Sequence, residues 1–150
     1  MIVAREEGPG GRVFEVVIGD LLVEPVDAIV RQRGPIPVGE AVVTAAGALP
    51  FLGVIHAVGP HLGVGHEEAL LVEALQAAFL RAHERGWRSL SFPAVSSGIF
   101  AVPLEVCARA YMVAVRRFFA AQPDTSLRTI RLCLLRGPLV DLVRAELTKE

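Results

Sequence analysis

The chain has 150 residues, 53% of them hydrophobic and 21% charged, with a formal net charge of −1. This length predicts one domain with a sizeable buried core. The near-neutral charge argues against direct nucleic-acid binding, because backbone phosphates are held by basic surfaces. The longest charge-free run, Ala41–Ile55, is too short to span a bilayer, so no membrane association is expected.

The N-terminal segment 1–11 is acidic and rich in glycine, and it lacks the apolar core of a secretory signal. We expect it to be flexible and the chain to be a monomeric domain of a larger protein. Cys107 lies in a helical pattern and Cys133 in a strand pattern. Two such cysteines favour buried free thiols over a disulfide. The expected location is therefore the cytoplasm, the nucleus or both.

Apolar runs of strand length come first along the chain, and helical periods then alternate with further strands. The predicted strands are Val13–Ile18, Val26–Val30, Val42–Thr44, Val54–Val58, Ser89–Val95 and Thr129–Leu135. The predicted helices are Glu67–Arg85, which Gly86 ends, Pro103–Phe119, and Leu139–Leu147, which Pro138 begins. Alternating strands and helices indicate a parallel sheet, so the predicted fold is α/β in three layers, α/β/α.

The connection between Val30 and Val42 is unusually short for a crossover between parallel strands. Gly34, Pro35 and nearby Pro and Gly residues exclude a helix there. Either the flanking strands are not parallel neighbours, or a segment is missing from the chain.

The stretch from Leu90 to Pro103 has the layout of a phosphate-binding loop. An apolar strand ends in small residues, turns at Ser96-Ser97-Gly98 and leads into a helix behind Pro103. Glycine lets the backbone approach a ligand, and exposed N–H groups near a helix start favour an anion. A simple tight strand-to-helix connection is the alternative.

Five short motifs follow one another along the chain. They are Gly19-Asp20-Leu21, Val26-Asp27-Ala28-Ile29-Val30, Gly39-Glu40-Ala41 with Thr44, Val54-Ile55-His56-Ala57-Val58-Gly59-Pro60, and Phe92-Pro93-Ala94-Val95-Ser96-Ser97-Gly98-Ile99-Phe100. Together they resemble the macro domain, the module that binds ADP-ribose, over the chain from about Val13 to its end. The run from Pro93 to Phe100 also resembles the macro domains of large mammalian ADP-ribosyltransferases. We therefore interpret residues 1–150 as a single macro domain, with a mixed, largely parallel sheet.

The resemblance implies which residues contact ADP-ribose. Asp20 would accept a hydrogen bond from the adenine amino group, and the Leu21 N–H would be a second contact. Phe100 would lie against the distal ribose. The alternatives are that Asp20 only caps a turn and that Phe100 is a core aromatic. The residues expected to surround the diphosphate, mainly through backbone N–H groups, are Ser96, Ser97, Gly98 and Ile99.

The chain departs from the family after Val30. There the family continues into an Asn-Ala-Ala-Asn stretch, a glycine-rich loop and helices, whereas here Arg31-Gln32-Arg33-Gly34 follows and the chain has no asparagine. The missing parts would cover the distal ribose and one side of the diphosphate, and in hydrolytic members they help to place water. A true deletion would leave the backbone continuous, whereas an omitted segment would leave a gap at Val30–Arg31.

Other catalytic constellations fail on spacing and order. Ala94-Val95-Ser96-Ser97-Gly98 resembles a nucleophile elbow, but His83 is the last histidine, and in that fold the histidine follows the serine. His56, His61 and His66 lack the spacing and partner ligands of a zinc site. We therefore assign no catalytic residue, no metal and no cofactor.

The function expected from the sequence is binding of ADP-ribose, free or as a mono-ADP-ribosyl modification on proteins. The partners would then be ADP-ribose and mono-ADP-ribosylated proteins. One alternative is a mono-ADP-ribosyl-protein hydrolase, which would need a polar group to position water. Another is a degenerate macro domain that acts as a protein-interaction module.

Overall fold

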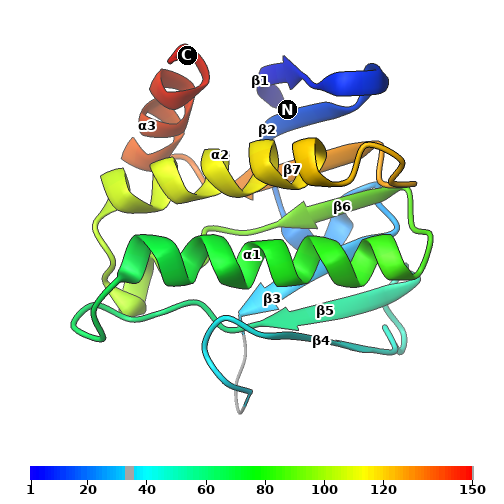
Figure 1. Cartoon of the computed structure of the whole chain (residues 1–150), viewed down its shortest axis with the longest axis horizontal. Helices are drawn as coiled ribbons and strands as arrows, with labels where there is room; N and C mark the ends of the chain where they lie inside the picture. Colours follow the sequence, from blue (N-terminus) through cyan, green and yellow to red (C-terminus); the bar gives the residue numbers. More distant parts are fainter. Residues whose placement is uncertain (33–35, 150) are drawn as a thin grey trace.

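The computed structural model describes residues 1–32 and 36–149, which form one seven-stranded sheet with helices packed on it (Figure 1). The strand order is β1-β2-β7-β6-β3-β5-β4. The strands are β1 (Ile2–Glu7), β2 (Val13–Ile18), β3 (Ala28–Gln32), β4 (Ala41–Thr44), β5 (Gly53–Ala57), β6 (Ser89–Phe92) and β7 (Thr129–Leu134). The α-helices of the described residues are α1 (Glu67–Glu84), α2 (Leu104–Ala121) and α3 (Pro138–Leu147).

The sheet is mixed and largely parallel, as predicted. Strands β2, β7, β6, β3 and β5 all run parallel, whereas the edge strands β1 and β4 are antiparallel to their neighbours. Ala28, Ile29 and Val30 of the central strand β3 are fully buried. Parallel strands covered on both faces need such continuous apolar runs. The α/β class is therefore confirmed.

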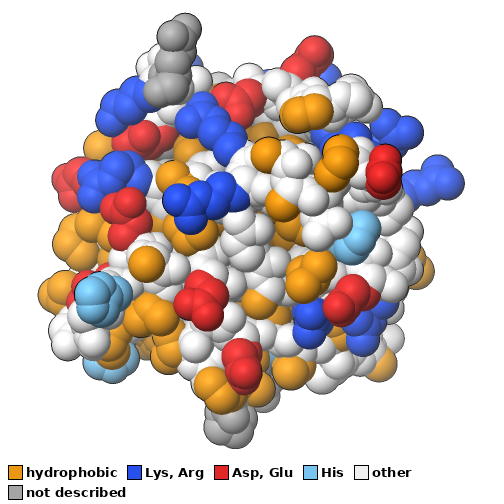
Figure 2. All heavy atoms as spheres, in the orientation of Figure 1, with side chains coloured by type: hydrophobic (Ala, Val, Ile, Leu, Met, Phe, Trp, Pro, Cys, Tyr) orange, Lys and Arg blue, Asp and Glu red, His pale blue; other side chains and the backbone are white. Residues whose placement is uncertain are grey.

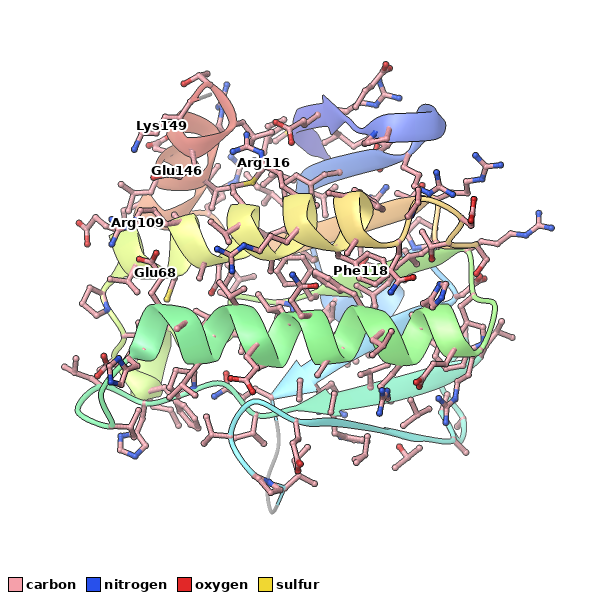
Figure 3. All side chains as sticks on the ribbon, in the orientation of Figure 1. Glu68, Arg109, Arg116, Phe118, Glu146 and Lys149 are labelled. Carbon is pink, nitrogen blue, oxygen red and sulfur yellow. The ribbon has the colours of Figure 1, made fainter. Side chains whose placement is uncertain are left out.

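All three α-helices contribute to the main core on one face of the sheet, where α2 contacts both α1 and α3 (Figure 1). Phe79 of α1 lies at the centre of this core, with its ring centroid 5.5 Å from that of Phe92 and 5.6 Å from that of Phe118. Figure 3 shows Phe118 on α2, on the side that faces α1. These edge-to-face contacts join both helices to strand β6.

The opposite face carries a much thinner layer. It consists of a one-turn 3-10 helix, η2 (Leu21–Val23), and the connection between β4 and β5. A small apolar cluster there contains Val26, Ile29, Phe51 and Val54. The third of the three expected layers is thus built from turns and loops in the described part of the chain.

Segment 1–11 is ordered, so the expectation of a flexible start was wrong. Ile2–Glu7 forms β1 and pairs with β2, and a 3-10 turn, η1 (Pro9–Gly11), follows. Glu6 also forms an ion pair with Arg116 of α2, with 2.7 Å between Glu6 Oε1 and Arg116 Nη2. Charged side chains suit an edge strand, because they discourage pairing with other chains. The same charges hid the strand pattern in the sequence.

Strand β3 runs without a break across the Val30–Arg31 bond. Strand β3 extends through Arg31 and Gln32, which pair in register with His56 and Ala57. The antiparallel β4 is separated from β3 by β5, so the short connection needs no helical crossover. This is the first of the two explanations given above. Arg33 and the two residues after it lie outside the described residues.

The other predicted strands and helices form where expected, with small displacements of their ends. Both cysteines are buried and unpaired, as predicted. Within residues 1–32 and 36–149, no helix has the length and apolar character needed to cross a bilayer.

Candidate ligand-binding cleft

A cleft of about 900 Å³ opens where strands β2, β7 and β6 end. Because these strands are parallel, their carboxyl ends meet at one edge of the sheet, which is where ligands bind in open α/β sheets. The volume lies within the roughly 300–1,000 Å³ that is usual for small-molecule sites. The lining residues are Ile18, Gly19, Asp20, Leu21, Pro93, Ala94, Ser97, Leu104, Cys133, Leu134, Leu135, Arg136, Gly137, Pro138 and Leu139.

Asp20 both caps a turn and lines the cleft. Its Oδ1 accepts a 2.9 Å hydrogen bond from the Leu22 N–H at the start of η2. This is the capping role considered as an alternative above. A carboxylate has a second oxygen, and no described residue donates a hydrogen bond to it. Asp20 can therefore cap η2 and still accept a hydrogen bond from a ligand.

Ser96 is held beneath the surface in a strained conformation. Its side chain is 1% exposed and its φ is 66°, in the left-handed region that non-glycine residues seldom adopt. Its N–H donates a 2.5 Å hydrogen bond to Oε1 of Gln32, and its buried hydroxyl has no partner in the described part of the chain. A side chain at position 59 would collide with this hydroxyl, so Gly59 is required beside it.

Ser97 lines the cleft and begins a one-turn 3-10 helix, η3 (Gly98–Phe100). Its hydroxyl donates a 2.7 Å hydrogen bond to the Ala94 carbonyl, which closes the loop on itself. Among the described residues, no hydrogen-bond acceptor is found for the N–H groups of Gly98 and Ile99. Successive unpaired N–H groups of this kind form a concavity that suits an anion.

The side chains of η3 itself do not line the cleft. That of Ile99 is 97% exposed. Phe100 is half-buried, its ring centroid is 6.4 Å from that of His61, and its carbonyl accepts a 2.8 Å hydrogen bond from the Leu62 N–H. Phe100 is therefore not a core aromatic. The contacts expected of η3 remain predictions, and for Gly98 and Ile99 they concern backbone N–H groups.

The structure brings Asp20, Leu21 and Ser97 to one cleft, and it adds a wall that we did not predict from the sequence. This wall is the end of β7 and the start of α3, residues 133–139. Its signal in the sequence was the run Arg136-Gly137-Pro138 directly after an apolar strand, since loops at the carboxyl ends of parallel strands share an edge.

Cys133 places a thiol in this wall. Burial raises the pKa of the thiol to about 11, and the negative charge of Glu24 adds to the rise. A thiol with so high a pKa is protonated at neutral pH and is a poor nucleophile. Cys133 therefore contributes shape and apolar surface to the cleft.

Comparison with known proteins identifies this architecture. The sequence profile of the macro domain family matches residues 7–111. The chain belongs to the macro domain family.

Relatives of this macro domain are found in bacteria and archaea. An uncharacterised protein of Thermotoga maritima is 45% identical over 129 residues, which are 83% of this chain but 22% of that protein. A Saccharolobus solfataricus protein is 36% identical over 91% of this chain and 75% of its own length. An O-acetyl-ADP-ribose deacetylase of Enterobacter cloacae is 37% identical over 70% of this chain and 59% of its own length. The macro domain thus spans only part of some of these relatives.

Solved structures share the fold. The Oceanobacillus iheyensis macrodomain with ADP has a TM-score of 0.85 at 20% identity, covering 96% of this chain and 95% of that chain. The Trypanosoma brucei macrodomain in complex with ADP-ribose has a TM-score of 0.78 at 21% identity, covering 88% of this chain and 68% of that chain. Identities this low compare folds and do not assign residue roles.

Proposed function

We propose that this macro domain binds ADP-ribose, either free or as a mono-ADP-ribosyl group on a protein. One observation carries the proposal. The cleft has a carboxylate, Asp20, in its lining, and Ser97 of the same lining leads directly into the unpaired N–H groups of Gly98 and Ile99. Adenine offers an amino donor and a diphosphate offers anionic acceptors, so the two features match the two ends of one ligand.

The ligand would lie across the carboxyl ends of the parallel strands. Adenine would enter between η2 and the wall formed by residues 133–139, with its amino group toward the free oxygen of Asp20. The diphosphate would receive hydrogen bonds from the N–H groups of Gly98 and Ile99. Backbone N–H groups supply this recognition without lysine, which agrees with the near-neutral charge of the chain.

Two relationships support the proposal. A macrodomain of the same fold has been solved with ADP and another with ADP-ribose. The relative from Enterobacter cloacae carries the name of an enzyme that acts on an ADP-ribose ester. Both point to the same class of ligand.

Isothermal titration calorimetry with ADP-ribose tests the proposal. We expect saturable binding, weaker binding of AMP and of ribose 5-phosphate, and competition between AMP and ADP-ribose. An absence of heat at millimolar ADP-ribose, with the protein shown to be folded by circular dichroism, would contradict it. That result would favour the alternative of a degenerate macro domain that acts as a protein-interaction module.

A second candidate function is hydrolysis of an ADP-ribose ester or of a mono-ADP-ribosyl bond. The name of the Enterobacter cloacae relative favours it. Hydrolysis needs a group that positions water. The chain has no asparagine, and Gln32, close to the expected Asn positions, is already bonded to Ser96 and Gly59.

Hydrolysis is tested by two incubations. One uses O-acetyl-ADP-ribose and follows acetate release, and the other uses a mono-ADP-ribosylated protein and follows loss of the label. Turnover above the uncatalysed rate in either incubation would establish an enzyme. Binding without turnover would leave the domain as a reader of the modification.

The partners of such a reader would be mono-ADP-ribosylated proteins in the cytoplasm or nucleus. The domain itself would be part of a longer protein. The two buried free thiols support a reducing compartment.

A further inference from the structure

A second cavity lies at the opposite edge of the sheet from the ligand cleft. Its volume is about 470 Å³, and Arg12, Arg88 and Arg128 line it together with residues 123–126. These arginines directly precede or adjoin the first residues of β2, β6 and β7. Because the three strands are parallel, their amino ends form one edge and the ADP-ribose cleft lies at the other. We call this cavity the arginine pocket.

The arginine pocket holds positive charge that the described residues do not neutralise. None of its three arginines forms an ion pair with a described carboxylate, and Asp124 is the one acidic residue among the described lining residues. Some other arginines do form ion pairs: Arg109 pairs with Glu68, and Arg116 pairs with Glu6. Figure 3 shows Arg109, Glu68 and Arg116 on the neighbouring helices, away from the arginine pocket.

The buried member of the pocket has an unused donor. Arg12 is only 8% exposed, and its Nη2 and Nη1 donate to the carbonyls of Thr125, at 2.6 Å, and Pro9, at 3.4 Å. Its Nε is buried and has no acceptor among the described residues. Buried guanidinium groups ordinarily have their N–H groups paired. An unmatched buried cation on the wall of a cavity indicates a place for a counter-anion.

The other two arginines have donors to spare. Arg128 donates only its Nη1, at 3.1 Å, to the Gly10 carbonyl, and no hydrogen bond from the Arg88 guanidinium is found within the described residues. Figure 2 shows basic side chains gathered at the right-hand edge of the molecule, where α2 ends and β7 begins in Figure 1. A purely structural role, in which Arg12 and Arg128 bond to backbone carbonyls of η1 and the 122–126 connection, accounts in part for these two arginines. It does not account for the presence of Arg88.

We propose that the arginine pocket binds a tetrahedral oxyanion of the phosphate type, either inorganic phosphate or the phosphate monoester of a small molecule. Guanidinium groups match phosphate oxygens with two parallel hydrogen bonds, and three arginines line this cavity. The volume of about 470 Å³ is typical of a small-molecule site and leaves space for an organic group beside the phosphate. This site is separate from the ADP-ribose cleft and does not depend on it.

Two-dimensional amide NMR of the full chain tests the proposal. Inorganic phosphate is titrated at constant ionic strength, with sodium chloride as the reference titration. We expect saturable shifts at the amides of Arg12, Arg88 and residues 123–128, with a millimolar or lower Kd. A parallel titration with glycerol phosphate separates the two sources: tighter binding of the ester identifies a metabolite site, and equal or weaker binding identifies a phosphate site.

The decisive variant is Arg88→Gln combined with Arg128→Gln, which leaves the buried Arg12 and its bonds in place. Loss of two charge-assisted contacts should weaken phosphate binding about tenfold or more. Arg144→Gln, on α3, is the matched control and should leave Kd unchanged. Three results would overturn the proposal: shifts that do not saturate, shifts confined to residues 97–100, or an unchanged Kd in the double variant.

Discussion

The Gln32 side chain ties the end of β3 to the loop after β6, because its Oε1 accepts a 2.5 Å hydrogen bond from the Ser96 N–H. Its Nε2 also donates to the Gly59 carbonyl at 3.4 Å. Ser96 has a left-handed backbone, which costs about 1–3 kcal/mol and persists only when the surroundings hold it. Gln32 supplies part of that hold.

We expect Gln32→Ala to weaken ADP-ribose binding by about tenfold, because the loop that precedes η3 loses its tie to β3. The buried Ser96 N–H is left without an acceptor, which should lower the free energy of unfolding by about 1–3 kcal/mol. Calorimetric titration and urea denaturation measure the two effects. Gln76→Ala on α1 is the control, since no hydrogen bond of the Gln76 side chain is found in the described chain. Equal affinities of Gln32→Ala and the parent protein would contradict the role of the tie.

Asp20→Asn separates the capping role of Asp20 from its proposed role in adenine recognition. Asparagine caps a helical turn about as well as aspartate, so the thermal midpoint should change little. An asparagine that caps Leu22 with its oxygen presents an NH2 group to the ligand in place of an acceptor. The Kd for ADP-ribose should rise about tenfold to a hundredfold, as for loss of a hydrogen bond to a charged group.

The matched ligand for this variant is the hypoxanthine analogue of ADP-ribose, which has a carbonyl in place of the adenine amino group. Asp20→Asn should prefer the analogue, and the parent protein should prefer ADP-ribose. Calorimetric titration of both proteins with both ligands gives the full comparison. If the variant keeps the parent's preference for ADP-ribose, Asp20 does not contact the adenine amino group.

Tyr111→Phe removes a buried hydrogen bond that holds the loop after β6 in place. The Tyr111 hydroxyl donates a 2.6 Å hydrogen bond to the Val95 carbonyl, and burial raises its pKa well above the ordinary value, so it remains a donor. The unpaired carbonyl should cost about 1–3 kcal/mol of unfolding free energy, measured by urea denaturation. Thr148→Val, which removes an exposed hydroxyl bonded to the Ala145 carbonyl, should change stability by no more than about 0.5 kcal/mol. Equal effects of the two variants would contradict the anchoring role.

The sequence predicted the parallel centre of the sheet from the alternation of strands and helices and from the apolar run of β3. Ala28, Ile29 and Val30 form a continuous apolar run, and such runs have few other uses in a domain of this size. The helix boundaries followed Gly86 and Pro138 for equally local reasons. Strand β1 was missed because its charged residues suit an edge position, which depends on the neighbouring strand.

The cleft could be predicted only in part. Asp20 and Ser97 were found through short motifs, but Arg136 and the residues beside it were not. They meet Asp20 because β7 lies next to β2 in the sheet. No local sequence pattern shows which strands are neighbours in a sheet. The arginine pocket was missed for the same reason, since Arg12 and Arg128 are joined by the pairing of β2 with β7.

Cys133 should respond to pH in a defined direction. Its pKa is raised from 9.0 to about 11 in the folded protein, so between these values the folded state keeps a proton that the unfolded state loses. Stability contributed by this group is therefore complete below pH 9 and is lost as pH rises toward 11, by an amount on the order of 1–3 kcal/mol. Urea denaturation from pH 8 to about 11 should show a smaller decline for Cys133→Ala than for the parent protein. Parallel curves for the two proteins would contradict the assignment.

An ion-pair network lies on the face of the sheet that carries the thin layer. We expect it to stabilise the fold only when all of its members are present. Arg131 contacts Glu24 and Glu15 at 3.0 Å each, and the side chain of Glu24 is 8% exposed. Glu24 also accepts a 2.7 Å hydrogen bond from the Ser91 hydroxyl. Arg131→Met leaves Glu24 without a cation and Glu15 with only a 3.9 Å contact to Arg5, and it should cost about 3–5 kcal/mol.

Removing the carboxylates as well should reverse most of that loss. Replacing a whole buried network by neutral groups is often close to neutral, whereas breaking it on one side is not. We therefore expect Arg131→Met combined with Glu15→Gln and Glu24→Gln to be more stable than Arg131→Met alone, by urea denaturation at pH 7. Arg109→Met provides the comparison at an exposed pair, because Arg109 contacts Glu68 with nearly half of its side chain in solvent. A triple variant no more stable than Arg131→Met would show that Arg131 acts through packing of its stem and not through its charge.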